Sequence, residues 1–153
     1  MCQLCNYPKM LTDSDLDVTE NRLHVLEVIG NNTCPLSAGE VYDVLQRSSS
    51  INKVTVYRIL DLLVDHGLVE RLNSLGKLSF YGLAPNAYHR RHPHFYCREC
   101  GRVDCLAPES LEVDFAALEK TFPGRIDKVE VRVDGICKNC ISKQNRTGQR
   151  TVK

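Results

Sequence analysis

Apolar residues recur at helical spacing three times in the first half of the chain. Thr19 can cap the first of these segments, which we expect to end near residue 29. Ser37 and Glu40 form the S-x-x-E capping box that starts the second, which should run to about residue 46. The third covers 53–66 and stops at Gly67. The apolar positions expected to face a core are Leu23, Leu26, Ile29, Val56, Ile59, Leu60 and Leu63.

A β-hairpin is predicted directly after the third helix. The runs 68–72 and 77–81 have strand composition, and 73–76 between them has the composition of a turn. Three helices followed by a two-stranded ribbon is the element order of a winged helix-turn-helix domain.

The second half has shorter elements. Short strands are predicted at 94–97 and 102–106, and a helix at 109–121 that would bury Leu111, Phe115 and Leu118. Apolar and charged residues alternate over 129–133, which predicts a half-buried strand leading to the last cysteine pair.

A change in composition marks a boundary near residue 84. The segment 84–87 contains Pro85 and has no apolar periodicity. Residues 1–84 carry 7 basic and 10 acidic side chains, a formal charge of −3, whereas 85–153 carry 13 and 9, a charge of +4. The sequence therefore predicts an α+β protein with one domain over 1–84, a second, small α/β domain over 85–141 and a polar tail over 142–153.

Overall charge and hydropathy exclude some classes of partner. The 153-residue chain has a formal charge of +1, so any contact with nucleic acid must be local. The sequence contains no apolar stretch of about 20 residues, and its start lacks the basic-then-apolar order of an export signal. We therefore expect a cytoplasmic protein with no membrane partner, in which cysteines stay reduced.

Eight cysteines occur, and six of them form C-x-x-C pairs. The pairs are Cys2/Cys5, Cys97/Cys100 and Cys137/Cys140, while Cys34 and Cys105 stand alone. Two such pairs can supply the four thiolates of a tetrahedral zinc shell, because the spacer lets both sulfurs face one ion at about 2.3 Å. We predict a structural Zn²⁺ bound by Cys97, Cys100, Cys137 and Cys140. The alternative is two unrelated pairs of buried cysteines.

The exposed face of the third predicted helix carries side chains suited to DNA. Lys53, Thr55, Tyr57 and Arg58 lie in its first turns, where a recognition helix presents side chains to base edges and phosphates. The alternative is an ordinary solvated helix face, which Asp61 and the negative charge of residues 1–84 favour.

Three of the five histidines, His89, His92 and His94, lie within six residues just before the first of these zinc-binding pairs. If this segment is extended, His92 and His94 project to the same face and supply half of a metal shell. The alternative is a basic surface strip, to which Arg90 and Arg91 contribute.

Several segments in a fixed order carry a resemblance to a known family. They are Val18 to Ile29, Ser37-Ala38 with Val41-Tyr42, Thr55 to Leu60 with Gly67-Leu68-Val69, and His92-x-His94-x-x-Cys97-x-x-Cys100-Gly101. Together, over roughly residues 15–141, they closely resemble the ferric uptake regulator (Fur) family.

The resemblance implies a homodimer with an N-terminal winged-helix DNA-binding domain and a C-terminal dimerisation domain that carries a structural zinc held by four cysteines. It also implies a second metal near the hinge that sets whether the dimer binds its operator. Tyr57 and Arg58 then fall in the recognition helix, and His92 and His94 are regulatory ligands.

The chain departs from the family pattern at positions that bear on this metal. Cys105 stands where members commonly place an acidic ligand, and Cys34 occupies a loop that often offers a histidine. The chain is also longer before His92, which brings in His89. Arg91 and Pro93 stand where ligands of an auxiliary site would be, and Glu112 alone remains from that group.

We therefore expect a regulatory site of His92, His94 and Cys105, completed by His89 or Glu70. A thiolate beside imidazoles favours zinc over the oxygen-rich shells that suit manganese, with iron second. A peroxide sensor is disfavoured, because the carboxylates expected around its iron are absent. The alternative for Cys105 is a small hydrophobic side chain packed beside the zinc cysteines.

The sequence predicts a metal-responsive repressor, a homodimer whose affinity for double-stranded operator DNA is set by Zn²⁺ or Fe²⁺ at the hinge. Lys77, in the predicted wing, would add a DNA contact to those of the helix. One alternative is a thiol or peroxide redox switch in which Cys34, Cys105 or the Cys2/Cys5 pair oxidises. Another is a zinc-stapled protein-interaction module that binds no DNA. We expect no enzymatic activity, since nothing resembles a nucleophile–base pair or a phosphate-cradling loop.

Overall fold

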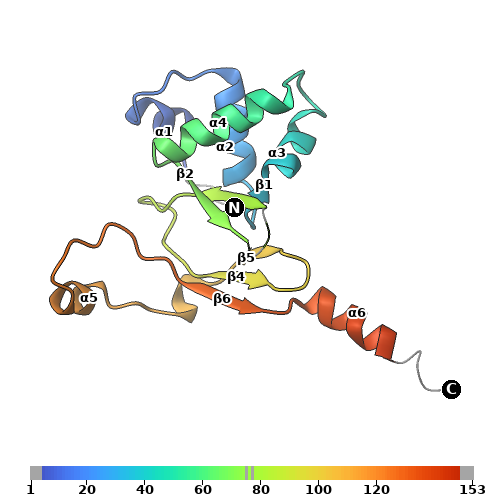
Figure 1. Ribbon diagram of the computed structural model, residues 1–153. Coiled ribbons are helices and arrows are strands. Elements are labelled where there is room, and N and C mark those ends of the chain that lie inside the picture. The colour runs from blue at the N-terminus through green and yellow to red at the C-terminus, as the bar shows by residue number, and fades with distance from the viewer. Residues whose placement is uncertain (1–4, 75, 77, 149–153) are drawn as a thin grey trace.

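The helices and strands form two groups along the chain, each built on a three-stranded sheet (Figure 1). The computed structural model describes residues 5–74, 76 and 78–148, and the α+β class expected from the sequence is confirmed. The first group contains α1 (Tyr7–Asp13), α2 (Glu20–Gly30), β1 (Leu36–Ser37), α3 (Ala38–Leu45), α4 (Lys53–Asp65), β2 (Val69–Asn73) and β3 (Ser79–Leu83). The second contains β4 (His94–Cys97), β5 (Val103–Cys105), a 3₁₀ turn (Pro108–Ser110), α5 (Phe115–Thr121), β6 (Arg132–Gly135) and α6 (Lys138–Gly148).

Side-chain caps start the three helices that the sequence predicted. The Thr19 hydroxyl accepts a hydrogen bond from the Arg22 backbone N–H at the start of α2. Ser37 and Glu40 form a complete capping box, in which each side chain accepts from the other residue's backbone N–H at 3.3 and 2.7 Å. The predicted bounds of α2, α3 and α4 are confirmed to within one residue.

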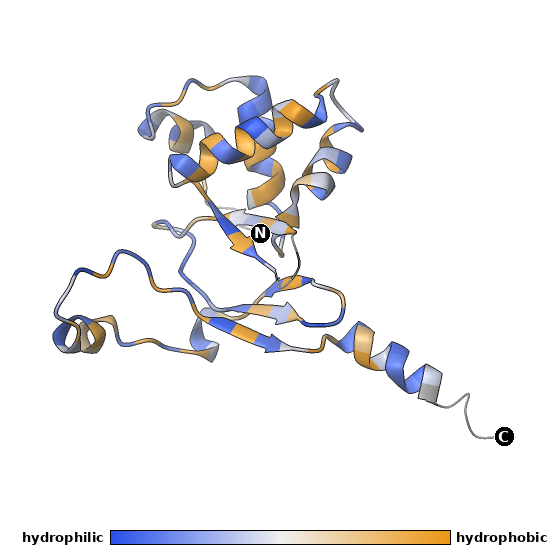
Figure 2. Ribbon diagram, viewed as in Figure 1, coloured by the Kyte–Doolittle hydropathy of each residue, from blue (hydrophilic) through white to orange (hydrophobic). Residues whose placement is uncertain are grey.

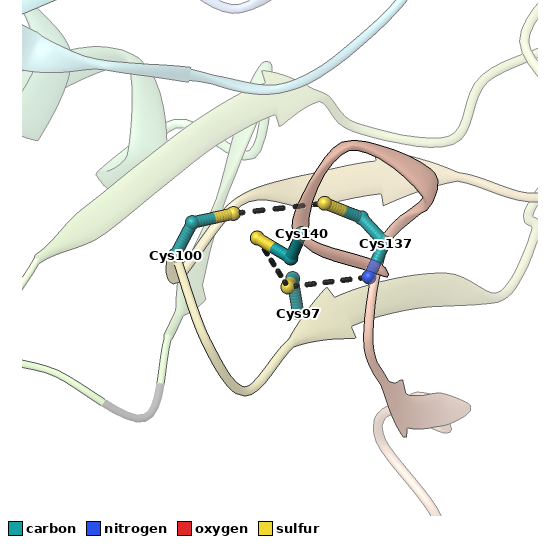
Figure 3. A group of neighbouring side chains, drawn as sticks. All are labelled: Cys97, Cys100, Cys137 and Cys140. Carbon is teal, nitrogen blue, oxygen red and sulfur yellow. Dashed lines mark hydrogen bonds between the residues drawn. The ribbon is translucent and has the colours of Figure 1, made fainter. Parts of the chain in front are cut away.

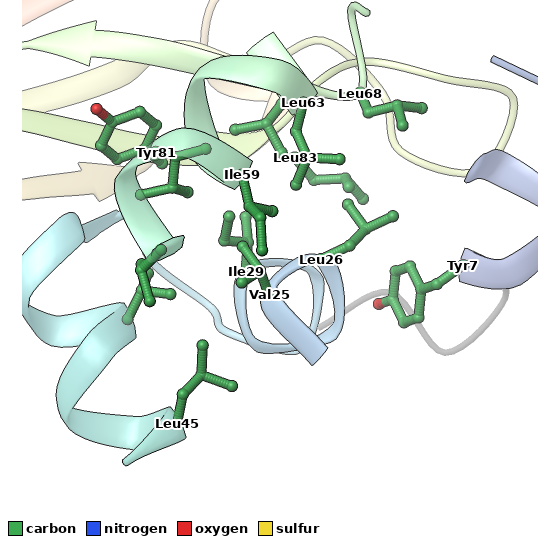
Figure 4. Close-up of a cluster of buried hydrophobic side chains, with 14 of the residues drawn as sticks. Tyr7, Val25, Leu26, Ile29, Leu45, Ile59, Leu63, Leu68, Tyr81 and Leu83 are labelled. Carbon is green, nitrogen blue, oxygen red and sulfur yellow. The ribbon is translucent and has the colours of Figure 1, made fainter. Parts of the chain in front are cut away.

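One hydrophobic core lies between α2, α3, α4 and the first sheet. Leu26 and Ile29 of α2 point toward Ile59 and Leu63 of α4 (Figure 4), and all four side chains are buried. Figure 2 shows hydrophobic segments alternating with hydrophilic ones along these helices. The apolar positions expected from the helical periodicity do face this core, except that Leu23 is only half-buried.

Helix α1 was not predicted. Asn6 caps it by accepting a hydrogen bond from the Lys9 backbone N–H at 3.0 Å, and Pro8 lies in its first turn. Tyr7 packs so closely on Gly30 that a Cβ there would lie 2.5 Å from the Tyr7 hydroxyl. The N-terminal segment is therefore an integral part of the helical core.

The first sheet has the order β1-β3-β2, so β3 is its central strand. The hairpin is confirmed, but its second strand runs over 79–83 rather than 77–81. The strand extends to Leu83 because that residue pairs with Val69 at the start of β2. On its other side, β3 pairs with the unpredicted strand β1, where Leu36 lies opposite Tyr81.

The second sheet has the order β5-β4-β6, with β6 parallel to β4. The predicted strands at 94–97 and 102–106 are confirmed, and the alternation over 129–133 gives half-buried valines although β6 begins only at Arg132. The single helix predicted over 109–121 is wrong. Asp114 accepts from the Ala117 backbone N–H and so starts α5 there, preceded by the separate 3₁₀ turn.

Helix α6 replaces part of the predicted polar tail. Residues 138–148 are helical and project away from the body of the protein, whereas 149–153 lie outside the described residues (Figure 1). Lysine, glutamine and arginine have good helix propensity, and the cysteine pair fixes the first turn of the helix. Within the described part of the chain, no helix is both long enough and apolar enough to cross a membrane.

A small second core joins the two groups of elements. The hairpin of β2 and β3 is the wing of the predicted winged helix. Its residues Leu72 and Phe80 pack with Tyr96 and Val103 from the second sheet, and all four are buried. The Arg132 guanidinium lies 3.8 Å from the Tyr96 ring centroid and donates a hydrogen bond to the Asn73 carbonyl at 3.0 Å. The wing is thus attached to the second sheet by apolar and polar contacts together.

We expect Leu72→Ala to lower the free energy of unfolding by about 2–5 kcal/mol, because it leaves a cavity in this shared core. Leu78→Ala is the matched control, since Leu78 is 57% exposed and its truncation should change stability by less than about 0.5 kcal/mol. Urea unfolding followed by circular dichroism measures both. Equal effects of the two variants would contradict a structural role for the core.

Candidate functional site

Four cysteine sulfurs converge where the second sheet ends. Cys97 closes β4, Cys100 follows in the next turn, and Cys137 and Cys140 lie at the start of α6. The sulfurs of this four-cysteine cluster point toward one another (Figure 3) and all lie within 4.8 Å of each other. The Cys97–Cys140 and Cys100–Cys137 sulfur distances are 3.9 and 3.8 Å.

These distances fit a tetrahedral zinc shell. Thiolates about 2.3 Å from a central zinc ion lie about 3.8 Å from one another. Backbone N–H groups, among them that of Cys137 at 3.3 Å, point at the Cys97 sulfur and lower the pKa of this thiol. Hydrogen bonds with the other cysteines raise the pKa of Cys140. A bound cation would favour the thiolate form of all four cysteines.

The turn between Cys97 and Cys100 also touches the wing. Gly101 has a φ of 72°, which closes this turn, and its carbonyl accepts a hydrogen bond from the Ser74 hydroxyl at 3.0 Å. Ser74 directly follows β2. The four-cysteine cluster and the tip of the wing are therefore in direct contact.

A second group of metal-ligating side chains lies between the two sheets. His92, His94 and Cys105 each present a ligand atom, and these atoms lie within 4.8 Å of one another. They line a cavity of about 370 Å³ together with Cys34 and Glu70, among other residues. His94 pairs with Cys105 across β4 and β5, so the antiparallel register brings these two ligands together.

The ring nitrogens of this group include two that could donate a lone pair to a cation. His92 Nδ1 lies 2.9 Å from the Arg90 carbonyl, which can only accept, so Nδ1 carries the proton and Nε2 keeps its lone pair. Among the described residues, the buried atoms His92 Nε2 and His94 Nδ1 have no hydrogen-bond partner. Buried polar atoms normally have a partner, and a metal ion would supply one here.

Burial favours the neutral form of the nearby imidazoles. Desolvation lowers the pKa of His94 to about 4. The pKa of His89 is also lowered, mainly by desolvation and to a smaller extent by the charge of His92. Neutral imidazole is the form that binds metals. Desolvation raises the pKa of Cys105 to about 11, so a metal must displace the thiol proton before the sulfur can act as a ligand.

The two remaining predicted ligands flank this group. The His89 ring packs edge-on against His92 with centroids 5.1 Å apart. Glu70, on β2, lies 3.7 Å from His94 Nε2 and 3.9 Å from the Lys128 ammonium, and burial raises the pKa of its carboxyl group. His89 reaches the cavity from the loop between β3 and β4, which we call the hinge loop, and Glu70 reaches it from β2. Cys105 belongs to the second sheet.

Cys34 was not among the predicted ligands, yet it lines the same cavity. Its thiol lies 3.2 Å from an Asp104 carboxylate oxygen, which in turn is paired with Arg102. Seventy residues separate Cys34 from Asp104 along the chain. Cys34 occupies a loop where family members often have a histidine, and this could have predicted that it lines the cavity. Nothing in the sequence predicted its contact with Asp104.

Helix α4 presents the predicted DNA-binding side chains to solvent. Lys53, Tyr57 and Arg58 are exposed, while the Thr55 hydroxyl donates a hydrogen bond to the capping Asn52 side chain. Asp61, which argued against DNA binding on this face, forms an ion pair with Arg71 of β2.

Two of the predicted functional residues cannot be placed. Lys77 of the wing and Cys2 of the N-terminal pair lie outside the described residues. Cys5, the partner of Cys2, is half-buried against the helical core.

Comparison with known proteins identifies the family. Residues 13–132 match the model of the ferric uptake regulator family. The chain is 31% identical over 138 residues to the ferric uptake regulation protein of Bacillus subtilis, covering 89% of this chain and 93% of that protein. It is 37% identical over 106 residues to the protein of the same name from Yersinia pestis, covering 68% and 70%.

Solved structures agree with the sequence matches. The crystal structure of the Vibrio cholerae ferric uptake regulator superposes with a TM-score of 0.69 at 28% identity, covering 86% of this chain and all of that one. The Helicobacter pylori regulator, described as having three functional metal binding sites, shares the fold with a TM-score of 0.70 at 20% identity, covering 92% and 97%. The chain therefore belongs to the ferric uptake regulator family of metal-responsive, DNA-binding transcription regulators.

Proposed function

We propose that this protein is a homodimeric repressor whose affinity for operator DNA is switched by zinc bound in the hinge cavity, with iron as the second candidate. Two observations carry the proposal: His92, His94 and Cys105 each bring a ligand atom within 4.8 Å of the others, and His92 Nε2 and His94 Nδ1 are buried with no hydrogen-bond partner among the described residues. In this proposal residues 1–84 bind DNA and residues 85–141 form the dimer.

The donor set supports zinc at both metal sites. Four thiolates at tetrahedral spacing suit a structural Zn²⁺, and they leave no open coordination position for a substrate. In the hinge cavity, His92, His94 and Cys105 would bind the regulatory metal, and His89 or Glu70 would complete its shell. The sulfur favours zinc, because carboxylate-rich shells suit harder ions.

The position of the cavity supports a switch. Its walls come from both sheets, so a metal held by ligands from the two sides would favour one arrangement of the wing relative to the second sheet. The effect of the metal on DNA affinity can then be no larger than the difference in metal affinity between that arrangement and the others. Each subunit of the dimer would present one α4 to an operator half-site.

The surface around α5 supports the dimer. Leu111, Phe115, Leu118 and Phe122 are between 37% and 53% exposed in the single chain, whereas the sequence analysis placed the first three in a core. A second copy of the chain would cover these side chains. An apolar cluster of this kind on a monomer is typical of an interaction surface.

The thiol redox switch is the second candidate, because Cys34 and Cys105 line one cavity. The raised pKa of Cys105 argues against it, since the thiolate is the form that reacts with peroxide. Loss of DNA binding on peroxide treatment, with both metal sites saturated, would favour this candidate over the metal switch.

Cys97→Ser or Cys140→Ser should unfold the second half and abolish the dimer, because binding at such a site contributes on the order of 10 kcal/mol to folding. Light scattering and metal analysis measure the two effects. Cys34→Ser, outside the cluster, is the matched control and should keep one tightly bound zinc per chain. A folded dimer of Cys97→Ser without this zinc would contradict the structural assignment.

Arg58→Ala should weaken operator binding by about 1–3 kcal/mol without changing zinc content, since it removes an exposed cation from α4. Fluorescence anisotropy at one fixed salt concentration measures the loss. Arg125→Ala is the control, because Arg125 is exposed, paired with Asp127 and remote from α4 in sequence. Equal affinity of both variants would show that α4 does not contact the operator.

Cys105→Ala should lower zinc affinity at the second site, retain the zinc of the four-cysteine cluster and make operator binding insensitive to added zinc. His92→Ala should behave in the same way, whereas His66→Ala, which alters an exposed histidine at the end of α4, should respond like the unchanged protein. Zinc titrations followed by DNA binding test all three. Full zinc dependence in Cys105→Ala would leave the thiol as a packing residue and remove the argument for zinc.

A further inference from the structure

The hinge loop between β3 and β4 is shaped by one residue, Asn86. Its Oδ1 accepts hydrogen bonds from the backbone N–H groups of Tyr88 at 2.8 Å and His89 at 3.0 Å. Its own backbone N–H donates to the His89 carbonyl at 2.9 Å. The His89 backbone N–H also donates to the Asn86 carbonyl at 3.3 Å, and together these hydrogen bonds fix the backbone of the loop up to His89.

The loop held in this way places the His89 imidazole at the metal cavity. His89 is half-buried, lines the cavity and packs edge-on against His92 at a centroid distance of 5.1 Å. The ring of His92 in turn lies 4.8 Å from that of His94. Three imidazoles thus follow one another from the hinge to β4, and His89 is the one nearest the hinge.

Asn86 is also connected to the winged-helix half. Its Nδ2 donates to the Ala84 carbonyl at 3.5 Å and lies 3.8 Å from the Cys5 sulfur. Cys5 packs against the helical core, and the Ala84 N–H donates to the Leu68 carbonyl, next to the first sheet. The side chain that orients His89 is therefore held by the winged-helix half of the protein.

We infer that Asn86 is a positioning residue that sets His89 as the hinge-side ligand of the regulatory metal. This inference rests on the proposed function and adds the residue through which the site is joined to the winged-helix half. Without the Asn86 side chain, the two hydrogen bonds to its Oδ1 would be lost, the loop would sample more conformations, and the metal would have to order it on binding. Residues that orient a ligand typically contribute about 10–100-fold to metal affinity.

The test measures Co²⁺ and Zn²⁺ affinity at the second site by competition with a chromophoric chelator, using the full-length protein with zinc in the four-cysteine cluster. His89→Ala and Asn86→Ala should each weaken binding by about 10–100-fold and change the visible spectrum of bound Co²⁺ in the same way. Asn86→Asp keeps the accepting oxygen and should stay close to the unchanged protein. Asn145→Ala, on the exposed face of α6, is the matched control.

The double variant Asn86→Ala/His89→Ala separates positioning from general stability. If Asn86 acts through His89, the double variant should bind no more weakly than His89→Ala alone. A further loss in the double variant would overturn the inference, because Asn86 would then support the loop independently of His89.

His89→Ala and His92→Ala distinguish failure of this inference from failure of the proposed function. Unchanged affinity and spectrum in His89→Ala, with binding lost in His92→Ala, would overturn the role of the hinge ligand and keep the regulatory site. Unchanged affinity in His92→Ala and Cys105→Ala as well would overturn the proposed site itself.

Discussion

A metal bound by the four cysteine sulfurs would hold together the second half of the chain, which buries few side chains of its own. Among the described residues beyond 84, the buried ones are Pro93, His94, Tyr96, Cys97 and Val103. Three strands of three or four residues cannot remove much apolar surface from water. Metal binding at the four-cysteine cluster is the contribution that would join β4 to α6 and close the sheet.

The wing and the cavity that contains His92 and His94 both contact the second sheet, which a metal in this cluster would stabilise. Leu72 and Phe80 of the wing have their apolar partners there, and the Ser74 hydroxyl reaches the carbonyl of Gly101, one residue after a zinc cysteine. The cavity is lined from both sheets, and its buried ring nitrogens have no hydrogen-bond partner among the described residues. If Glu70 of β2 completed the shell of such a metal, the metal would be held only while the two sheets keep their spacing. The same contacts would then account for metal affinity and for its effect on the wing.

Local sequence determined the elements whose signals lie within one turn or one strand. The caps at Thr19 and Ser37, the stop at Gly67 and the spacing of the cysteine pairs each depend on residues at most a few positions apart. The motifs that carry the family resemblance are also short, so their order along the chain was enough to indicate the family. Such features can be read from sequence because helical periodicity and metal-ligand spacing are short-range.

Tertiary structure decided what depends on residues that are distant in sequence. The place of β3 at the centre of its sheet depends on β1, and the apolar residues near α5 stay exposed because this single chain offers them no core. Asp61 pairs with Arg71 of β2, so the exposed face of α4 is less acidic than composition indicates. The approach of Cys34 to Asp104 required segments 70 residues apart to meet. These contacts follow from the packing of different helices, strands and loops against one another, and no local pattern of residue types specifies them.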